Sequence, residues 1–276
     1  SFIRFTKVDL NWFFDQWIET GKRLDYAVKG VKHRNADVGQ RIHFRRSGDM
    51  QMPIEFAVKA NDGKSYDYLI PNNWFVKKTS ATVLPRWIGF DELQRDYYAE
   101  VNIPTGIADV RIDTSYRLGD ANMLNNSLRF PFESTFDSHI RNWPNWRTYQ
   151  GFARPDLWYN GYDGLKVGAH FHGSYLRYKH QVWFSAWLNT GLGQSLPGGG
   201  VNTAYDPISL NFRYENGTGR WLNGSSIFVA ARLLDGLEQY EGGFNWDIPF
   251  TKTSLYTNMK FMLRRDSTDL TYLINT

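Results

Sequence analysis

Cysteine is absent from this chain of 276 residues, which is long enough to form one large domain or two ordinary ones. Its absence excludes disulfides, thiolate zinc sites and cysteine nucleophiles. No apolar run approaches the roughly 18 residues that a membrane-spanning helix needs, so we expect no such helix. The opening residues SFIRFTKVDLNWFF also lack the basic start, apolar run and cleavage site of a signal peptide. We therefore expect these residues to be internal to a longer protein.

Long runs of like charge are also missing. The formal net charge is only +4, and charged residues make up 22% of the chain. The densest basic segments, KGVKHR and HFRRSGD, are too short for a nucleic-acid-binding stripe and are typical of an exposed strand or loop. The sequence therefore predicts no nucleic-acid partner.

Catalytic signatures are absent as well. A zinc-peptidase HExxH motif needs a glutamate directly after its first histidine, and none of the six histidines is followed by one. The glycine-rich GQSLPGGG lacks the Lys-[Ser/Thr] of a phosphate-binding loop, and no Gly-x-Ser-x-Gly elbow occurs. His170 and His172 are weak candidates for metal ligands, because residues two apart share one face of a strand, but no third ligand is evident. We predict no catalytic residue in this chain.

Aromatic residues, in contrast, reach 17% of the chain, with 11 tryptophans. This content suits β structure, a carbohydrate-facing surface or the aromatic girdles of a membrane barrel. Trp143, Trp146 and Trp158 lie in a stretch rich in Asn, Pro and Gly. If the chain recognises a glycan or a peptide, these three residues are its candidate ligand-binding residues.

The periodicity predicts a mainly β chain that begins with one helix. In TKVDLNWFFDQWIE (6–19), apolar residues recur at helical spacing after a capping pair, Thr6 and Asp9. Gly21 ends this helix, which we assign to residues 1–22.

Short alternating strands follow over residues 23–117 and predict a β-sandwich. The NDG turn at 61–63 predicts a hairpin between MPIEFAVKA and KSYDYLIP. Residues 118–163 lose the alternation, and we interpret them as an aromatic-rich linker with ordered portions.

From residue 164 to residue 276 the alternation returns over longer segments. In the first of them Leu165, Val167, Ala169 and Phe171 alternate with Lys166, Gly168, His170 and His172. We count about seven such segments, most of about 9–12 residues, the last beginning near Asp269. A tilted strand needs about 9–11 residues to cross a bilayer, so the pattern predicts an antiparallel, up-and-down β-meander of outer-membrane-barrel type.

A large soluble antiparallel sheet with one wet face would show the same alternation. Strand length, aromatic content and loop length favour the membrane interpretation. The connections RYKHQ and FTKTS are short, whereas those around GQSLPGGG and YENGTGRWLNGSS are long. Short turns on one side and long loops on the other are typical of such barrels. Because bacterial barrels have an even number of strands, at least eight, we expect this sheet to be only part of one.

About 40% of the chain resembles the region downstream of the catalytic domain in aminopeptidase-N-like zinc metallopeptidases. The matching segments are LNWFFDQWIETG, GDMQMPIEFAVKANDGKSYDYLIPNNWF and VRIDTSYRLGDANMLNN. The segment from RPDLWYNGYDGLKVGAHFHG onward is similar to the opening of bacterial surface-antigen-type barrels. The combination resembles membrane-tethered metallopeptidases of the Bacteroidetes type.

The resemblance implies a helix that closes an absent catalytic module, then a β-sandwich, then the start of a barrel. It implies zinc for the parent protein but no cofactor in this chain, because the family's catalytic signatures are missing here. The expected function is a non-catalytic portion that braces the catalytic module and anchors it at the bacterial outer membrane. Its expected partners are outer-membrane lipid and that module, with a periplasmic or surface-exposed location. The alternatives are an envelope binding or transport protein for glycan or peptide, and a structural subunit of an envelope complex.

Overall fold

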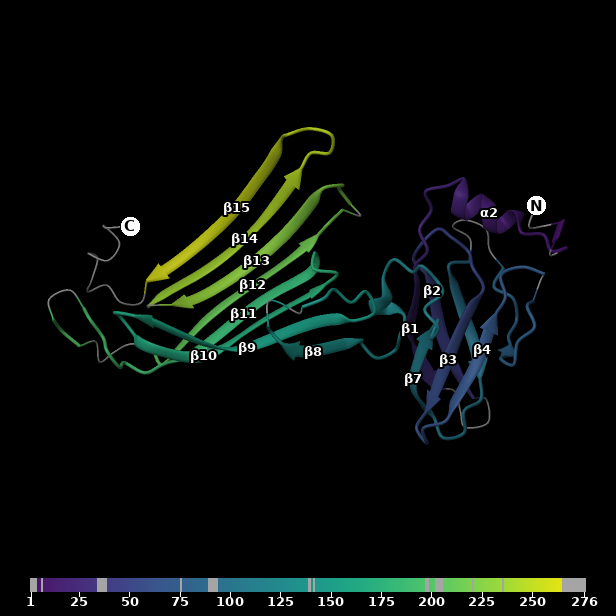
Figure 1. The fold of residues 1–276 in the computed structure, drawn as a ribbon, viewed down its shortest axis with the longest axis horizontal. Coiled ribbons are helices and arrows are strands. Elements are labelled where there is room, and N and C mark those ends of the chain that lie inside the picture. The colour runs from purple at the N-terminus through teal and green to yellow at the C-terminus, as the bar shows by residue number, and fades with distance from the viewer. Residues whose placement is uncertain are drawn as a thin grey trace. The chain divides into compact units, whose positions relative to one another are not determined.

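The chain folds into two compact units, Ser1–Pro131 and Phe132–Thr276, in the computed structural model shown in Figure 1. Both units are mainly β, as predicted. None of the described helical segments combines the length and the apolar character that a transmembrane helix requires. The structure describes residues 4–5, 7–33, 39–74, 76–88, 94–138, 140, 142–196, 199–201, 206–219, 221–234 and 236–264.

The first unit begins with the helix α2 (Asn11–Ile18), which is shorter than the predicted helix over 6–19. Thr6 lies outside the described residues, and Asp9 accepts a hydrogen bond from the backbone N–H of Asn11 at 3.0 Å. The side chain of Gln16 holds the helix to the segment just before the strand that begins at Ile54, because it accepts from the backbone N–H of Gln51 at 2.7 Å. The helix is therefore fixed by tertiary hydrogen bonds rather than by a capping box.

Two sheets build the rest of this unit. One has the order β1-β2-β6 and the other the order β5-β4-β3-β7. Their strands are β1 (Tyr26–His33), β2 (Gln40–Arg46), β3 (Ile54–Ala60), β4 (Ser65–Ile70), β5 (Thr82–Val83), β6 (Asp96–Val101) and β7 (Ile107–Ile112).

Alternating apolar side chains of both sheets meet in one core. Phe44 of β2 and Phe56 of β3 lie across it with ring centroids 4.7 Å apart, and Ile42 and Ile54 are fully buried beside them. The NDG hairpin is present between β3 and β4, with Gly63 at φ +86°, a conformation that favours glycine. The sequence patterns missed β1, because a bulge at Gly30 breaks its alternation.

One buried acid in this unit makes its stability depend on pH. Asp120 is 8% exposed and accepts hydrogen bonds from the backbone N–H groups of Tyr26 at 2.9 Å and Asn122 at 2.8 Å. Burial, which disfavours the charged form, outweighs these hydrogen bonds and raises the pKa of the Asp120 carboxyl to about 7.

We expect the first unit to be more stable at pH 5 than at pH 8. An unfolded aspartate ionises near pH 3.9, so the contribution of Asp120 is complete below about pH 4 and is lost as the pH rises through about 7. A pKa difference of this size corresponds to at most about 4 kcal/mol of unfolding free energy. Thermal unfolding followed by near-ultraviolet circular dichroism measures this trend. Asp120→Asn should flatten it, and an equal pH dependence in the variant would contradict the assignment.

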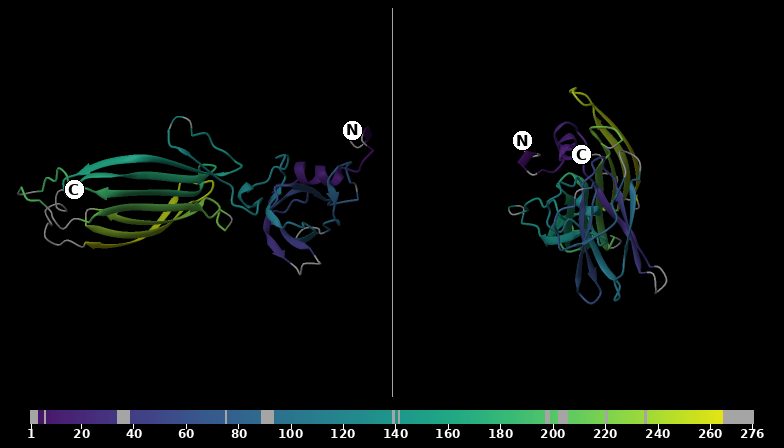
Figure 2. Two further views of the ribbon diagram at one scale, coloured as in Figure 1. Left: turned by 90° about the horizontal axis from the view of Figure 1, so that it is seen from below. Right: turned by 90° about the vertical axis from the view of Figure 1, so that its right-hand side faces the viewer.

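The second unit contains one eight-stranded sheet with the order β15-β14-β13-β12-β11-β10-β9-β8. Figure 2 shows its strands side by side in a curved sheet. Neighbours from β9 to β15 pair antiparallel, and β8 pairs parallel with β9. The strands are β8 (Phe132–Phe136), β9 (Tyr149–Asn160), β10 (Gly164–Tyr175), β11 (Lys179–Asn189), β12 (Ile208–Gly217), β13 (Ser225–Leu234), β14 (Leu237–Asp247) and β15 (Ser254–Arg264).

Residues 118–163, expected as a linker, contain a 3-10 helix and the strands β8 and β9. Pro155 and the aromatic residues on both faces hid the alternation of β9 in the sequence. The strand accommodates Pro155 because β8 pairs with β9 only as far as Ala153. Beyond that point, no described strand needs a backbone N–H from this edge of β9.

The expected separation of short and long connections is wrong. The segments 161–163, 190–207 and 235–236 connect strands at one end of the sheet, and the segments 176–178, 218–224 and 248–253 connect them at the other. The two long loops around GQSLPGGG and YENGTGRWLNGSS follow consecutive strands, which antiparallel order places at opposite ends. The connections have 3, 18 and 2 residues at one end and 3, 7 and 6 at the other, so the longest and the shortest lie at the same end. The last predicted strand, from Asp269, lies outside the described residues.

Candidate functional site

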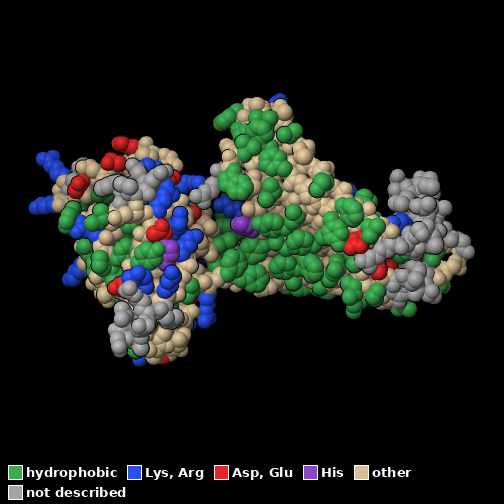
Figure 3. Space-filling model, turned by 180° about the vertical axis from the view of Figure 1, so that it is seen from behind, with side chains coloured by type: hydrophobic (Ala, Val, Ile, Leu, Met, Phe, Trp, Pro, Cys, Tyr) green, Lys and Arg blue, Asp and Glu red, His purple; other side chains and the backbone are tan. Residues whose placement is uncertain are grey.

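The eight-stranded sheet has one face on which nearly all side chains are apolar, here called the apolar face. Antiparallel register places the alternate residues of β9 to β15 on this face. Its exposed members are Leu157, Tyr159, Leu165, Val167, Phe184, Leu188, Ile208, Ile227, Val229, Tyr240, Leu255, Met259, Phe261 and Leu263. Leu157 is 70% exposed and Met259 is 82% exposed. Figure 3 shows hydrophobic side chains gathered over this sheet.

The opposite face, here called the polar face, contains most of the buried side chains of the unit. Lys166 and Ser209 are almost completely buried there, as are Ser185, Asn189 and Gln239. A water-soluble sheet with one wet face shows the reverse arrangement, with its apolar side chains buried and its polar ones exposed. The amphipathic pattern of this sheet is therefore inverted.

A charged cluster lies on the polar face, at the end of the sheet where the turn 161–163 connects β9 to β10. The ammonium of Lys166 forms an ion pair with the carboxylate of Asp163, and both side chains are completely buried. Lys166 also donates to Ser209 Oγ at 2.8 Å and lies 5.2 Å from the centre of the Trp158 ring. Because a buried charge is tolerated only with partners, this cluster fixes the turn at 161–163 to β12.

One signal of this cluster is visible in the sequence, in the segment NGYDGLK. Asp163 and Lys166 are three residues apart on either side of a turn glycine, Gly164 at φ +74°. Sequence analysis did not select either residue, because an acid and a lysine near a turn are usually solvated. Only the pairing of β10 with β11, and of β11 with β12, brings Ser209 next to them.

His170 and His172 both lie on the polar face, with ring centroids 6.2 Å apart. His170 Nδ1 is 2.7 Å from Ser185 Oγ, and His172 stacks on Phe152 and lies 3.7 Å from a carboxylate oxygen of Asp137. Within the part of the chain that the structure describes, no group of three or more His, Asp or Glu side chains could hold a metal ion.

The three candidate tryptophans do not form one site. Trp143 and Trp146 lie in the loop before β9, where Tyr175 donates to the backbone oxygen of Trp146 at 2.8 Å. Trp158 lies near the other end of β9 and packs against Trp187, with ring centroids 5.8 Å apart. Nine residues of extended chain separate Trp158 from the start of β9, a distance of about 30 Å.

Two pockets share a wall on the polar face. The first, of about 280 Å³, is lined by Phe152, His172, Arg177, Gln181 and Trp183, among others. The second, of about 330 Å³, is lined by His170, Trp183, Asn211, Arg213, Ala230, Arg232, Gln239 and Glu241. Trp183 contributes to both, and sequence analysis did not single it out because it lies in a regular alternating strand.

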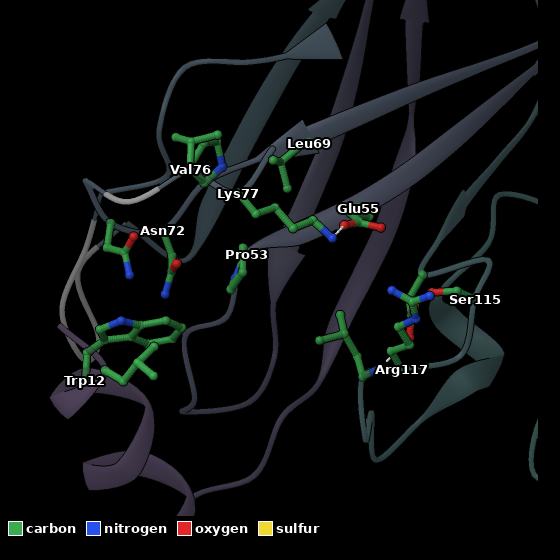
Figure 4. Close-up of a pocket in the computed structure, with 14 residues that line it drawn as sticks. Trp12, Pro53, Glu55, Leu69, Asn72, Val76, Lys77, Ser115 and Arg117 are labelled. Carbon is green, nitrogen blue, oxygen red and sulfur yellow. Dashed lines mark hydrogen bonds and ion pairs between the residues drawn. The ribbon is translucent and has the colours of Figure 1, made fainter. Parts of the chain in front are cut away.

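A third pocket, of about 220 Å³, lies in the first unit between α2 and the β3–β4 hairpin (Figure 4). Apolar residues form most of its lining, including Trp12 of the helix and Pro53, Leu69 and Val76. The ion pair between Lys77 and Glu55 crosses it, and the exposed side chain of Arg117 lies at its edge. The apolar character of this lining suits an apolar side chain.

The described part of the second unit presents two surfaces on one sheet. Its two distinguishing features are an exposed apolar face and a polar face with pockets, on one sheet. No family model matches the chain, and no curated protein or solved structure matches it at a significant level, so functional assignment rests on the geometry of these surfaces.

Proposed function

We propose that the eight-stranded sheet is part of the wall of an outer-membrane β-barrel, with its apolar face against lipid. The chain would be the non-catalytic, anchoring portion of a zinc aminopeptidase-like protein. The observation that carries the proposal is the inverted amphipathic pattern. Exposed, contiguous apolar surface of this extent is rare on soluble monomers and marks an interaction with protein or membrane. Lipid is the occupant that accepts apolar side chains along all seven antiparallel strands.

The dimensions of the sheet suit a bilayer. Strands β9 to β15 are 10 to 12 residues long, and a tilted strand crosses the hydrocarbon core with about 9–11 residues. On β10 the apolar row runs from Leu165 to Gly173, about 27 Å along the strand. At a tilt of 35–45° this row spans roughly 20 Å, close to the apolar band of such barrels.

The tyrosine and tryptophan side chains of the apolar face lie toward the strand ends. Tyr159 and Tyr240 lie toward one end, and Tyr214 and Trp246 toward the other, where Trp246 donates to the backbone oxygen of Asn223 at 3.1 Å. Tyrosine and tryptophan favour the level of the lipid headgroups because they combine an apolar ring with a polar group.

Among the described strands, none pairs with the outer edge of β15, and this edge supports a larger wall. Nearly every residue of β15 is exposed, and the strand is 11 residues long without proline or glycine. Natural proteins rarely leave such an edge uncovered. β9 and β15 run in the same direction, since six antiparallel pairings connect them. β8 covers the outer edge of β9 only as far as Ala153, so antiparallel closure onto the remainder of β9 requires an odd number of further strands after β15.

The first unit supports the bracing role in this proposal. Around α2 it exposes large apolar side chains, among them Trp17, Ile18 and Trp74, beside the apolar pocket that Trp12 lines. Such a surface suits a contact with another protein module. By resemblance, we assign that module as the zinc-containing catalytic domain of the parent protein, which supplies all catalytic groups.

Flotation with lipid vesicles tests the anchoring function. We expect the purified chain, diluted from denaturant into dilauroyl phosphatidylcholine vesicles, to float with them in a density gradient. It should resist extraction by high salt and carbonate, because apolar burial rather than charge holds it. A matched truncation that ends after Pro131 should stay in the aqueous fraction. A full chain that stays monomeric and water-soluble without detergent would overturn the proposal.

A further inference from the structure

The larger pocket of the polar face is lined by Ala230 and its cross-strand neighbours. We propose that this pocket binds a saccharide that carries a carboxylate. Such binding goes beyond membrane anchoring. The shape of the pocket, its aromatic wall and its charge balance support it.

The pocket exists because Ala230 is small and its cross-strand neighbours on the polar face are large. Cross-strand neighbours place Trp183, Arg213, Ala230 and Glu241 in line across β11 to β14. The methyl group of Ala230 leaves a gap between the side chains of Arg213 and Glu241. This gap opens the pocket of about 330 Å³, which is within the range of small-molecule sites.

The lining groups suit a sugar. Trp183 offers an aromatic wall, against which the C–H groups of a pyranose ring can pack. The next row across the sheet places Asn211, Arg232 and Gln239 beside the same gap. Planar amide and guanidinium groups supply donors and acceptors in fixed directions, as recognition of several hydroxyl groups requires.

The charges favour an anionic ligand. Arg213 forms an ion pair with Glu215 at 2.8 Å, so its charge is compensated. Glu241 accepts from Asn258 at 3.0 Å and lies 3.9 Å from Lys260. Among the described residues, Arg232 donates to the amide oxygen of Asn211 at 3.4 Å.

Within the described residues, no carboxylate comes within ion-pair distance of Arg232. It is the surplus cation of the pocket, and its planar guanidinium can hold a carboxylate through two hydrogen bonds. The ligand class that fits these groups is therefore a short oligosaccharide containing a uronic acid.

Ligand-observed saturation-transfer NMR on the full chain in detergent micelles tests this inference, with digalacturonate as the probe. Its dimethyl ester is the uncharged match of nearly equal size. We expect digalacturonate to bind with a dissociation constant at or below about 1 mM and the ester to bind at least about tenfold more weakly. Equal binding of the two sugars, or no binding of digalacturonate at about 10 mM, would overturn the proposal.

Two variants locate the site. Ala230→Leu fills the gap and Arg232→Gln removes the surplus cation, so each should weaken digalacturonate binding at least about tenfold. Ala186→Leu adds the same volume on the apolar face and should leave binding unchanged. Binding that survives both Ala230→Leu and Arg232→Gln would contradict the assignment. Vesicle flotation of Arg232→Gln should equal that of the unmodified chain, so failure here and failure of the anchoring function are distinguishable.

Discussion

Met259→Arg is expected to prevent most of the chain from entering lipid vesicles. Met259 is at the middle of β15 on the apolar face and is 82% exposed, with Gly242 as its cross-strand neighbour. An arginine at the bilayer midplane on the lipid-facing side of a barrel costs about 2–4 kcal/mol. We therefore expect less of the chain to float with dilauroyl phosphatidylcholine vesicles. Its constant for partitioning from water into the vesicles should fall about thirtyfold or more at equilibrium.

Asn258→Arg is the matched control, because Asn258 is the preceding residue of the same strand and is also exposed. Its side chain lies on the polar face and donates to Glu241 Oε1 at 3.0 Å, so an arginine there meets a carboxylate instead of lipid. Flotation should change little. In water alone, both substitutions should be tolerated equally, since both sites are exposed. Equal flotation of the two variants would contradict the orientation of the sheet.

Lys166→Met is expected to destabilise the second unit by about 3–5 kcal/mol. The substitution removes the ammonium group and leaves the carboxylate of Asp163, which is completely buried, without its ion-pair partner. The loss of the hydrogen bond to Ser209 Oγ, 2.8 Å long, adds to this effect. Unfolding in urea, followed by the near-ultraviolet signal of the packed Trp158 and Trp187 rings, measures the change.

Two further variants separate charge from packing at this cluster. Asp163→Asn in the Lys166→Met background removes the uncompensated charge and should recover part of the lost stability. Lys252→Met removes an exposed lysine from the connection between β14 and β15 and should change stability by less than about 0.5 kcal/mol. A small effect of Lys166→Met, similar to that of Lys252→Met, would show that the ion pair is not buried in solution.

Much of the architecture was readable from local patterns. The NDG turn and the alternation in IEFAVKA and SYDYLI predicted the β3–β4 hairpin, because turn chemistry and period two act within a few residues. The alternation from Leu165 onward predicted β10 with the correct residues on each face. β1 and β9 were not predicted. The bulge at Gly30 and the proline at position 155 interrupt the alternation of apolar and polar residues that indicates a strand.

The candidate sites were less accessible to sequence reasoning. Trp143 and Trp158 looked like members of one aromatic stretch, but an extended strand places residues that are close in sequence at opposite ends of a sheet. The pocket around Ala230 shows the converse. Trp183, Arg232 and Glu241 come from three strands, and only the cross-strand register brings them together.

By itself, the sequence determined that the chain has no thiol chemistry, is mainly β and carries long strands with one apolar side. These properties follow from composition and from the fixed side-chain period of a strand. The tertiary structure decided which side is buried. A soluble sheet and a membrane wall have the same alternation, and they differ only in whether the apolar or the polar face is covered. In this sheet Lys166 is buried on the polar face and Met259 is exposed on the apolar face, the reverse of a soluble sheet. The sequence could not show this, because burial depends on contacts between distant strands.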